Sequence, residues 1–93
     1  MKEPMVYLKG KFVPASAAHI NIFDFGIVLG ATFTDLTRTF RHVPFRLEDH
    51  VRRLYRSCLY GGIVLPITPE EMMARTNELL AMNERLIRPE EDI

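Results

Sequence analysis

The sequence predicts a single small α+β domain, in which one mostly antiparallel sheet carries two helices packed on a single face. Three observations lead to this prediction. The length of 93 residues allows one domain. Short apolar and alternating runs fill residues 5–46, whereas residues 47–88 carry apolar side chains at helical spacing. The connections between the predicted strands are short, which favours antiparallel pairing.

The first two predicted strands form a hairpin at the N-terminus. Residues 5–8 and 12–14 are apolar, and Gly10 lies between them. Glycine adopts a positive φ without steric cost, which suits a tight turn. A connector of small residues follows over positions 15–18, and two glycines bracket an apolar loop at positions 27–29.

The clearest predicted strand covers residues 32–40, which are rich in β-branched and aromatic side chains. Strand alternation places three of its side chains on one face: Thr34, Leu36 and Arg38. The opposite face carries the side chains between them: Phe33, Asp35, Thr37 and Thr39. We expect Asp35 to lie at the strand surface or to pair with an arginine. A turn at residues 41–43 and a short edge segment at 44–46 complete this half.

Two helices are predicted in the second half of the chain. The first covers residues 47–60 and ends at the glycine pair 61–62. The second begins at Pro69, with Thr68 as its N-cap, and ends before Pro89. We expect four apolar side chains of these helices to be buried: Val51, Leu54, Leu79 and Leu80.

The composition argues against several classes of protein. Twelve basic and twelve acidic residues give a formal net charge of zero, which disfavours nucleic-acid binding. No apolar run approaches the ~20 residues that span a bilayer, and the N-terminus has no signal-peptide pattern. Cys58 is the only cysteine, which fits the reducing cytoplasm. We therefore expect a cytoplasmic protein without membrane or nucleic-acid partners.

The histidines do not share a metal-ligand spacing, so the sequence predicts no metal site. We expect His50 to be a partly buried structural residue bonded to a backbone group. Arginine is more informative, because six of the nine arginines fall in one stretch: Arg38, Arg41, Arg46, Arg52, Arg53 and Arg56. The planar fork of arginine binds phosphate and carboxylate through two hydrogen bonds.

Arg53 differs from its neighbours in position. It lies next to the apolar stripe at Leu54 and three residues after His50. An arginine at the edge of a packed stripe can direct its guanidinium into a cleft, and a phosphate ligand is one reason for that placement. For Arg52 and Arg56 the simpler interpretation is a solvated helix face.

Four segments of the chain carry a family resemblance: MVYLKGKFVP at 5–14, FDFG at 23–26, GATFTDLTR at 30–38 and PFRLEDHVRRLYRS at 44–57. Together they resemble the start of the class IV (fold-type IV) aminotransferases, which use pyridoxal 5'-phosphate (PLP). The family includes branched-chain and D-amino-acid aminotransferases, amine transaminases and aminodeoxychorismate lyase. The resemblance implies the two-layer small domain of these enzymes.

The resemblance also implies roles for individual residues. In the family, the arginine of the segment corresponding to residues 50–57 binds the cofactor phosphate, a role that falls here on Arg53. The aromatic residue that faces the family's active site corresponds to Thr34, and the family's glutamate corresponds to Asp35. Leu36 and Arg38 share the strand face of Thr34, so these three residues are the candidate lining of the substrate pocket.

Intact family members are much longer than this chain, and the lysine that holds their cofactor lies in a second domain. None of the three lysines here matches it: Lys2, Lys9 and Lys11. The resemblance therefore implies that residues 1–93 are the N-terminal domain of a longer enzyme, without the C-terminal cofactor domain. We expect no catalytic residue in this chain and no activity from it alone.

The implied enzyme transfers an amino group between an amino acid, or an amine, and a 2-oxo acid, and we favour a branched-chain type. A homodimer is expected, because a fragment of an enzyme exposes the apolar surface that its missing part covers. The alternative is a non-catalytic module that dimerises or binds a partner. A third interpretation, nucleic-acid binding by the arginine cluster, is disfavoured by the zero net charge.

Overall fold

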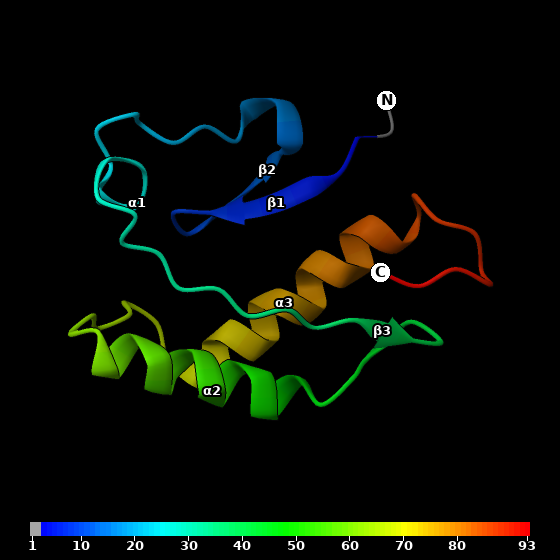
Figure 1. The fold of residues 1–93 in the computed structure, drawn as a ribbon. Helices are drawn as coiled ribbons and strands as arrows, with labels where there is room; N and C mark the ends of the chain where they lie inside the picture. The colour runs from blue at the N-terminus through cyan, green and yellow to red at the C-terminus, as the bar shows by residue number, and fades with distance from the viewer. Residues whose placement is uncertain (1–2) are drawn as a thin grey trace.

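A computed structural model describes residues 3–93 of the chain (Figure 1). The elements follow the order β1 (Met5–Leu8), β2 (Lys11–Pro14), η1 (Ala15–Ala17), α1 (Phe25–Val28), β3 (Thr39–Phe40), β4 (Val43–Pro44), α2 (Leu47–Tyr60) and α3 (Pro69–Glu84). The predicted α+β class and the antiparallel pairing of its strands are confirmed.

The first hairpin has the predicted form. β1 and β2 pair antiparallel, from Met5 opposite Pro14 to Leu8 opposite Lys11. The two turn residues, Lys9 and Gly10, both have positive φ, at 54° and 80°. A two-residue turn with this backbone matches the right-handed twist of the strands that it joins.

Side-chain hydrogen bonds fix this hairpin on α3. The Asn83 side chain accepts a hydrogen bond from the Met5 amide at 2.8 Å and donates one to the Met5 carbonyl at 3.0 Å. The amide group of Asn83 thus satisfies both backbone groups of Met5. This contact joins residues that are 78 positions apart and sets the hairpin beside the end of α3 (Figure 1).

The helices begin where the sequence predicts. α2 covers residues 47–60, and α3 starts at Pro69 with the Thr68 hydroxyl accepting from the Glu71 amide at 3.1 Å. The two helices pack against each other. Of the four side chains expected to be buried, only Val51 is buried, at 5% exposure, whereas Leu54, Leu79 and Leu80 are half-buried.

The predicted strand over residues 32–40 is wrong for most of its length. Only Thr39 and Phe40 are in a strand, and β3 pairs with β4 in a hairpin separate from the first. The strands thus form two two-stranded sheets rather than one. A strand needs a neighbour that completes its backbone hydrogen bonds. Among the described residues, no strand pairs with the segment 31–38, which runs past α2 and α3 instead (Figure 1).

The turn of the second hairpin has a strained backbone. Arg41 and His42 have φ values of 50° and 66°, a region that residues other than glycine adopt at a cost. Asp92 stabilises this turn, because its Oδ1 accepts a hydrogen bond from the His42 amide at 2.8 Å. The Thr39 amide donates to the Ile93 carbonyl at 2.7 Å, so residues 92–93 lie beside β3.

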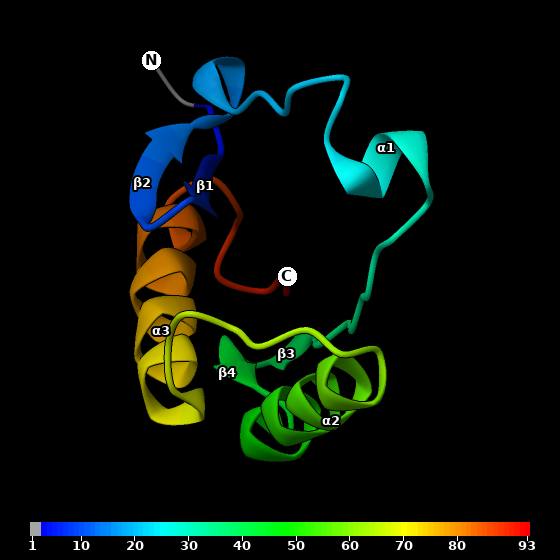
Figure 2. The same ribbon diagram turned by 90° about the vertical axis from the view of Figure 1, so that its left-hand side faces the viewer.

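The described part of the chain buries little apolar surface. Val51 and Cys58 are its buried apolar residues, each 5% exposed. The segment that contains α1 lies away from the helices (Figure 2), and its apolar side chains are exposed: Ile20, Ile22, Phe23, Phe25, Ile27, Val28 and Leu29. Within residues 3–93, no helix has the length and apolar character needed to cross a bilayer.

Candidate functional site

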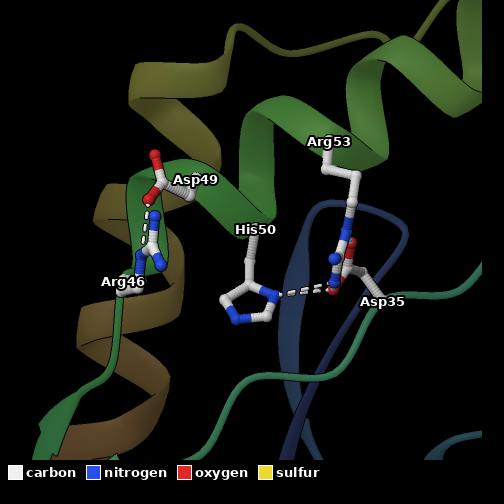
Figure 3. A network of polar contacts seen from close by, with 5 residues as sticks. All are labelled: Asp35, Arg46, Asp49, His50 and Arg53. Carbon is white, nitrogen blue, oxygen red and sulfur yellow. Dashed lines mark hydrogen bonds and ion pairs between the residues drawn. The ribbon is translucent and has the colours of Figure 1, made fainter.

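Arg53 and Asp35 form a two-point ion pair between α2 and the segment that precedes β3 (Figure 3). The Arg53 Nε donates to Asp35 Oδ2 at 2.8 Å, and Nη2 donates to Oδ1 at 2.7 Å. Of the two alternatives expected for Asp35, a place at a strand surface or an arginine partner, the structure shows the arginine partner. The partner is the arginine that the sequence singles out.

His50 joins the same carboxylate from one turn earlier on α2. Its Nδ1 lies 2.8 Å from Asp35 Oδ1 and 3.1 Å from the Nη2 of Arg53. His50 is half-buried, as predicted, but the predicted backbone partner is wrong, because a side-chain carboxylate takes that place. The sequence signal for this arrangement is the spacing of three residues between His50 and Arg53, which puts both side chains on one face of a helix.

The electrostatics of the cluster follow from its hydrogen bonds. The Asp35 side chain is only 9% exposed. Hydrogen bonds from Arg53, and then from His50, hold the pKa of the Asp35 carboxyl well below its usual range. The same bond to Asp35 raises the pKa of Arg53. The pair is therefore fully charged at neutral pH.

Side chains alternate between two faces in the segment around Asp35. The ring of Phe33 lies against Gly61, so closely that a Cβ at position 61 would overlap it. Asp35 and Thr37 line a hollow beside α2 and α3, whereas the alternate side chains of Thr34, Leu36 and Arg38 are exposed. The predicted alternation of faces is thus present although most of the predicted strand is not.

A depression of about 460 Å³ adjoins the cluster along α2. Its lining contains four arginines but a single acidic residue: Arg46, Arg52, Arg53 and Arg56, with Asp49. Asp49 is paired with Arg46 at 2.8 Å (Figure 3). Arg52 and Arg53 also have acidic partners outside this lining, and the lining further includes Phe45 and His50.

The arginines of this lining differ in what they contact. Arg52 donates to Glu48 and Glu70, each at 3.0 Å. Arg53 is 60% exposed, and Asp35 occupies only its Nε and Nη2 edge. Within residues 3–93, neither the Nη1 of Arg53 nor the side chain of Arg56 has a hydrogen-bond partner. Arg52 and Arg56 both line the depression, and the expected solvated helix face describes the exposed Arg56 better than the half-buried, paired Arg52.

The candidate pocket residues lie elsewhere. Thr34, Leu36 and Arg38 are exposed on the outer side of their segment, opposite Asp35, and Leu36 is 86% exposed. The guanidinium of Arg38 stacks on the Phe40 ring at 3.9 Å and lies 3.7 Å from Asp92. None of these three residues lines the depression at Arg53.

Neither Lys9 nor Lys11 lines the depression at Arg53. Lys9 and Lys11 are exposed at the turn of the first hairpin, and Lys2 lies outside the described residues. Across residues 3–93, no group of histidine, cysteine and acidic side chains is arranged to hold a metal ion.

No family model matches the chain. It is nevertheless similar to curated proteins over most of its length. It is 37% identical over 78 residues to a "putative branched-chain-amino-acid aminotransferase" of Methanocaldococcus jannaschii, which is 84% of this chain and 27% of that protein.

Two further relatives match at lower identity. A D-alanine aminotransferase of Bacillus licheniformis is 29% identical over 80 residues, covering 86% of this chain and 28% of that protein. The aminodeoxychorismate lyase of Bacillus subtilis is 26% identical over 80 residues, covering 86% of this chain and 27% of that protein. The chain thus spans about a quarter of the length of the curated relatives that it matches.

Proposed function

The chain is homologous to class IV aminotransferases over most of its length, and from this premise we propose that it is the N-terminal domain of a PLP-dependent aminotransferase. In this proposal the second domain supplies the lysine that holds the cofactor. The substrates are an amino acid or amine and a 2-oxo acid, and the first of the relatives above favours a branched-chain type.

The observation that carries this proposal is the setting of Arg53. Its guanidinium is fixed along one edge by Asp35, is 60% exposed, and lines a depression together with three further arginines. A phosphate is a compact anion with several acceptor oxygens, and it suits an arginine fork with an open edge. The residues present therefore fit the phosphate end of PLP.

When bound, PLP withdraws electrons from the substrate carbon that carries the amino group. The role of this chain is to bind and orient. Arg53 holds the phosphate, which fixes one end of the cofactor. Thr34, Leu36 and Arg38 form one wall of the substrate pocket on the outer face of their segment, and the second domain forms the opposite wall.

In this proposal the 93-residue chain alone does not catalyse transamination. Lys9 and Lys11 lie at the turn of the first hairpin, which packs on α3, and neither lines the depression at Arg53. A lysine that bonds to PLP must be held at the cofactor's reactive carbon and activated by its surroundings.

We further propose that the enzyme is a homodimer that works in the cytoplasm, where the free thiol of Cys58 stays reduced. The exposed apolar side chains of residues 20–29 form a surface of the kind that marks an interface. Light scattering of the full-length enzyme tests this proposal, and a monomer at high concentration contradicts it.

A second candidate function is a non-catalytic module that dimerises or binds a partner. It is favoured by one observation, the small amount of apolar surface that residues 3–93 bury on their own. Both candidates use the same exposed surface, so an assay of catalysis separates them.

The experiment compares the chain alone with the protein encoded by the complete reading frame. Both are incubated with PLP, reduced with borohydride and digested, and transamination is measured in parallel. We expect the full-length protein to retain PLP on a lysine beyond residue 93 and to be active, and the chain alone to be inactive. A reading frame that ends at codon 93, or a full-length protein that does not retain PLP, supports the non-catalytic module instead.

A further inference from the structure

We propose that Asp35 is a positioning residue for phosphate binding, because its carboxylate holds one edge of the Arg53 guanidinium and leaves the other edge open to the ligand. This inference rests on the proposed function of Arg53. It assigns a role to a residue that does not itself touch the phosphate.

The Arg53 guanidinium has one edge that is occupied and one part that is open. Asp35 takes the edge formed by Nε and Nη2, at 2.8 and 2.7 Å. Nη2 also lies 3.1 Å from His50 Nδ1, so Nη1, with its two hydrogens, is the part of the guanidinium that stays available. A phosphate can therefore bind at Nη1 without displacing the carboxylate.

Asp35 is a rigid anchor for Arg53. Asp35 is 9% exposed, and His50 contacts the same oxygen as Arg53 at 2.8 Å. The Phe33 ring against Gly61 holds the backbone two residues earlier. A free arginine side chain loses considerable rotamer entropy when it binds a ligand, and an arginine that is already held loses less. Asp35 thus prepares Arg53 before the phosphate arrives.

Positioning and charge change the phosphate affinity in opposite directions. A carboxylate near a bound phosphate repels it, so charge alone predicts that removing Asp35 strengthens phosphate binding. Positioning predicts the opposite, because the released guanidinium becomes mobile. The sign of the change in Asp35→Asn therefore separates the two accounts.

The experiment uses the 93-residue chain, labelled with nitrogen-15, and inorganic phosphate as the probe. The Nε–H signal of Arg53 reports the bond to Asp35, and the phosphate titration gives the affinity. Asp35→Asn keeps the size of the side chain and loses its charge, and we expect a roughly 3- to 10-fold weaker affinity because neutral hydrogen bonds are weaker than charged ones. Asp35→Glu keeps the charge and should retain more of the affinity.

Glu48→Gln is the matched control. It removes one negative charge from the same helix, and Glu48 pairs with Arg52 rather than with Arg53. We expect the Nε–H signal of Arg53 and the phosphate affinity to stay at their wild-type values. A loss equal to that of Asp35→Asn would indicate a general effect of charge and would overturn the proposal.

Three further results decide the outcome. Unchanged or tighter phosphate binding in a folded Asp35→Asn variant overturns the positioning role. If that variant does not fold, the wild-type spectrum decides. Phosphate should leave the hydrogen bond from Arg53 Nε–H to Asp35 intact, and loss of this bond during the titration contradicts the proposal.

The Arg53→Ala variant tests the proposed function separately. If phosphate binding survives that change, Arg53 is not the phosphate ligand, whatever Asp35 does.

Discussion

Two adjacent arginines on α2 have opposite settings. Arg52 contacts Glu48 and Glu70 in a cluster whose side chains are 42%, 65% and 68% exposed. Arg53 contacts Asp35, which is 9% exposed and lies on an irregular segment rather than on a helix. Exposed ion pairs contribute little to stability, whereas a nearly buried carboxylate fixes the geometry of its partner. Residue type and charge are thus the same at both positions, and the burial of the acidic partner makes the difference.

Gly61→Ala should have the largest effect on stability of the changes that separate the two clusters. Gly61 contacts the Phe33 ring, two residues before Asp35. The added methyl group would displace the Phe33 ring, and overpacking of this kind costs about 1–3 kcal/mol of unfolding free energy. Urea denaturation measures the loss. In a Phe33→Ala background the same change should cost much less, as a double-mutant cycle would show. Equal costs in both backgrounds would mean that the ring does not hold the segment in place.

Acid should affect the Asp35 cluster in a defined pH window. The pKa of Asp35 is lowered in the folded protein, relative to about 3.9 in an unfolded chain. The stability that this carboxylate contributes is therefore complete above about pH 4 and is lost as the pH falls from there towards the folded pKa. We expect wild type to be more stable than Asp35→Asn near neutral pH and the difference to shrink in acid. A difference that does not depend on pH would contradict the charged pair.

Salt should give the smallest effect, and it should act on the Arg52 cluster. Charges exposed to solvent are screened strongly at ~1 M ionic strength, where the Debye length is about 3 Å. We expect Glu70→Gln to lower the melting temperature slightly at low salt and not at all at high salt. The Asp35→Asn difference should persist in both, and its disappearance at high salt would remove the distinction between the clusters.

The parts of the fold that follow from local signals were predictable from the sequence. The bounds of α2 follow from its apolar stripe and the Gly61-Gly62 pair, and Thr68 and Pro69 mark the start of α3. The first hairpin follows from Gly10. The strand over residues 32–40 was not predictable, because β propensity does not tell whether a partner strand exists. The positive φ values of Arg41 and His42 had no sequence signal, since that turn depends on Asp92, which is 50 residues away.

The candidate site was predictable in part. Alternation put Asp35 on the face opposite Thr34, and helical position singled out Arg53. Their contact across 18 residues required the structure, because the segment before β3 has no regular element that fixes its path. The place of His50 on the same carboxylate was missed for the same reason. The phosphate role of Arg53 and the pocket role of Thr34, Leu36 and Arg38 stay predictions.

The central claim is that Arg53, and not its neighbour, holds the phosphate of PLP. The most direct test is a PLP titration of Arg53→Ala, Arg53→Lys and Arg52→Ala in the full-length enzyme. Loss of a charge-assisted contact at Arg53 should weaken PLP binding about 10- to 150-fold, with partial recovery for lysine, which keeps the charge but not the fork. Arg52→Ala should lose far less, because Glu48 and Glu70 already engage that side chain. Equal losses at the two positions, or no loss at Arg53, would contradict the claim.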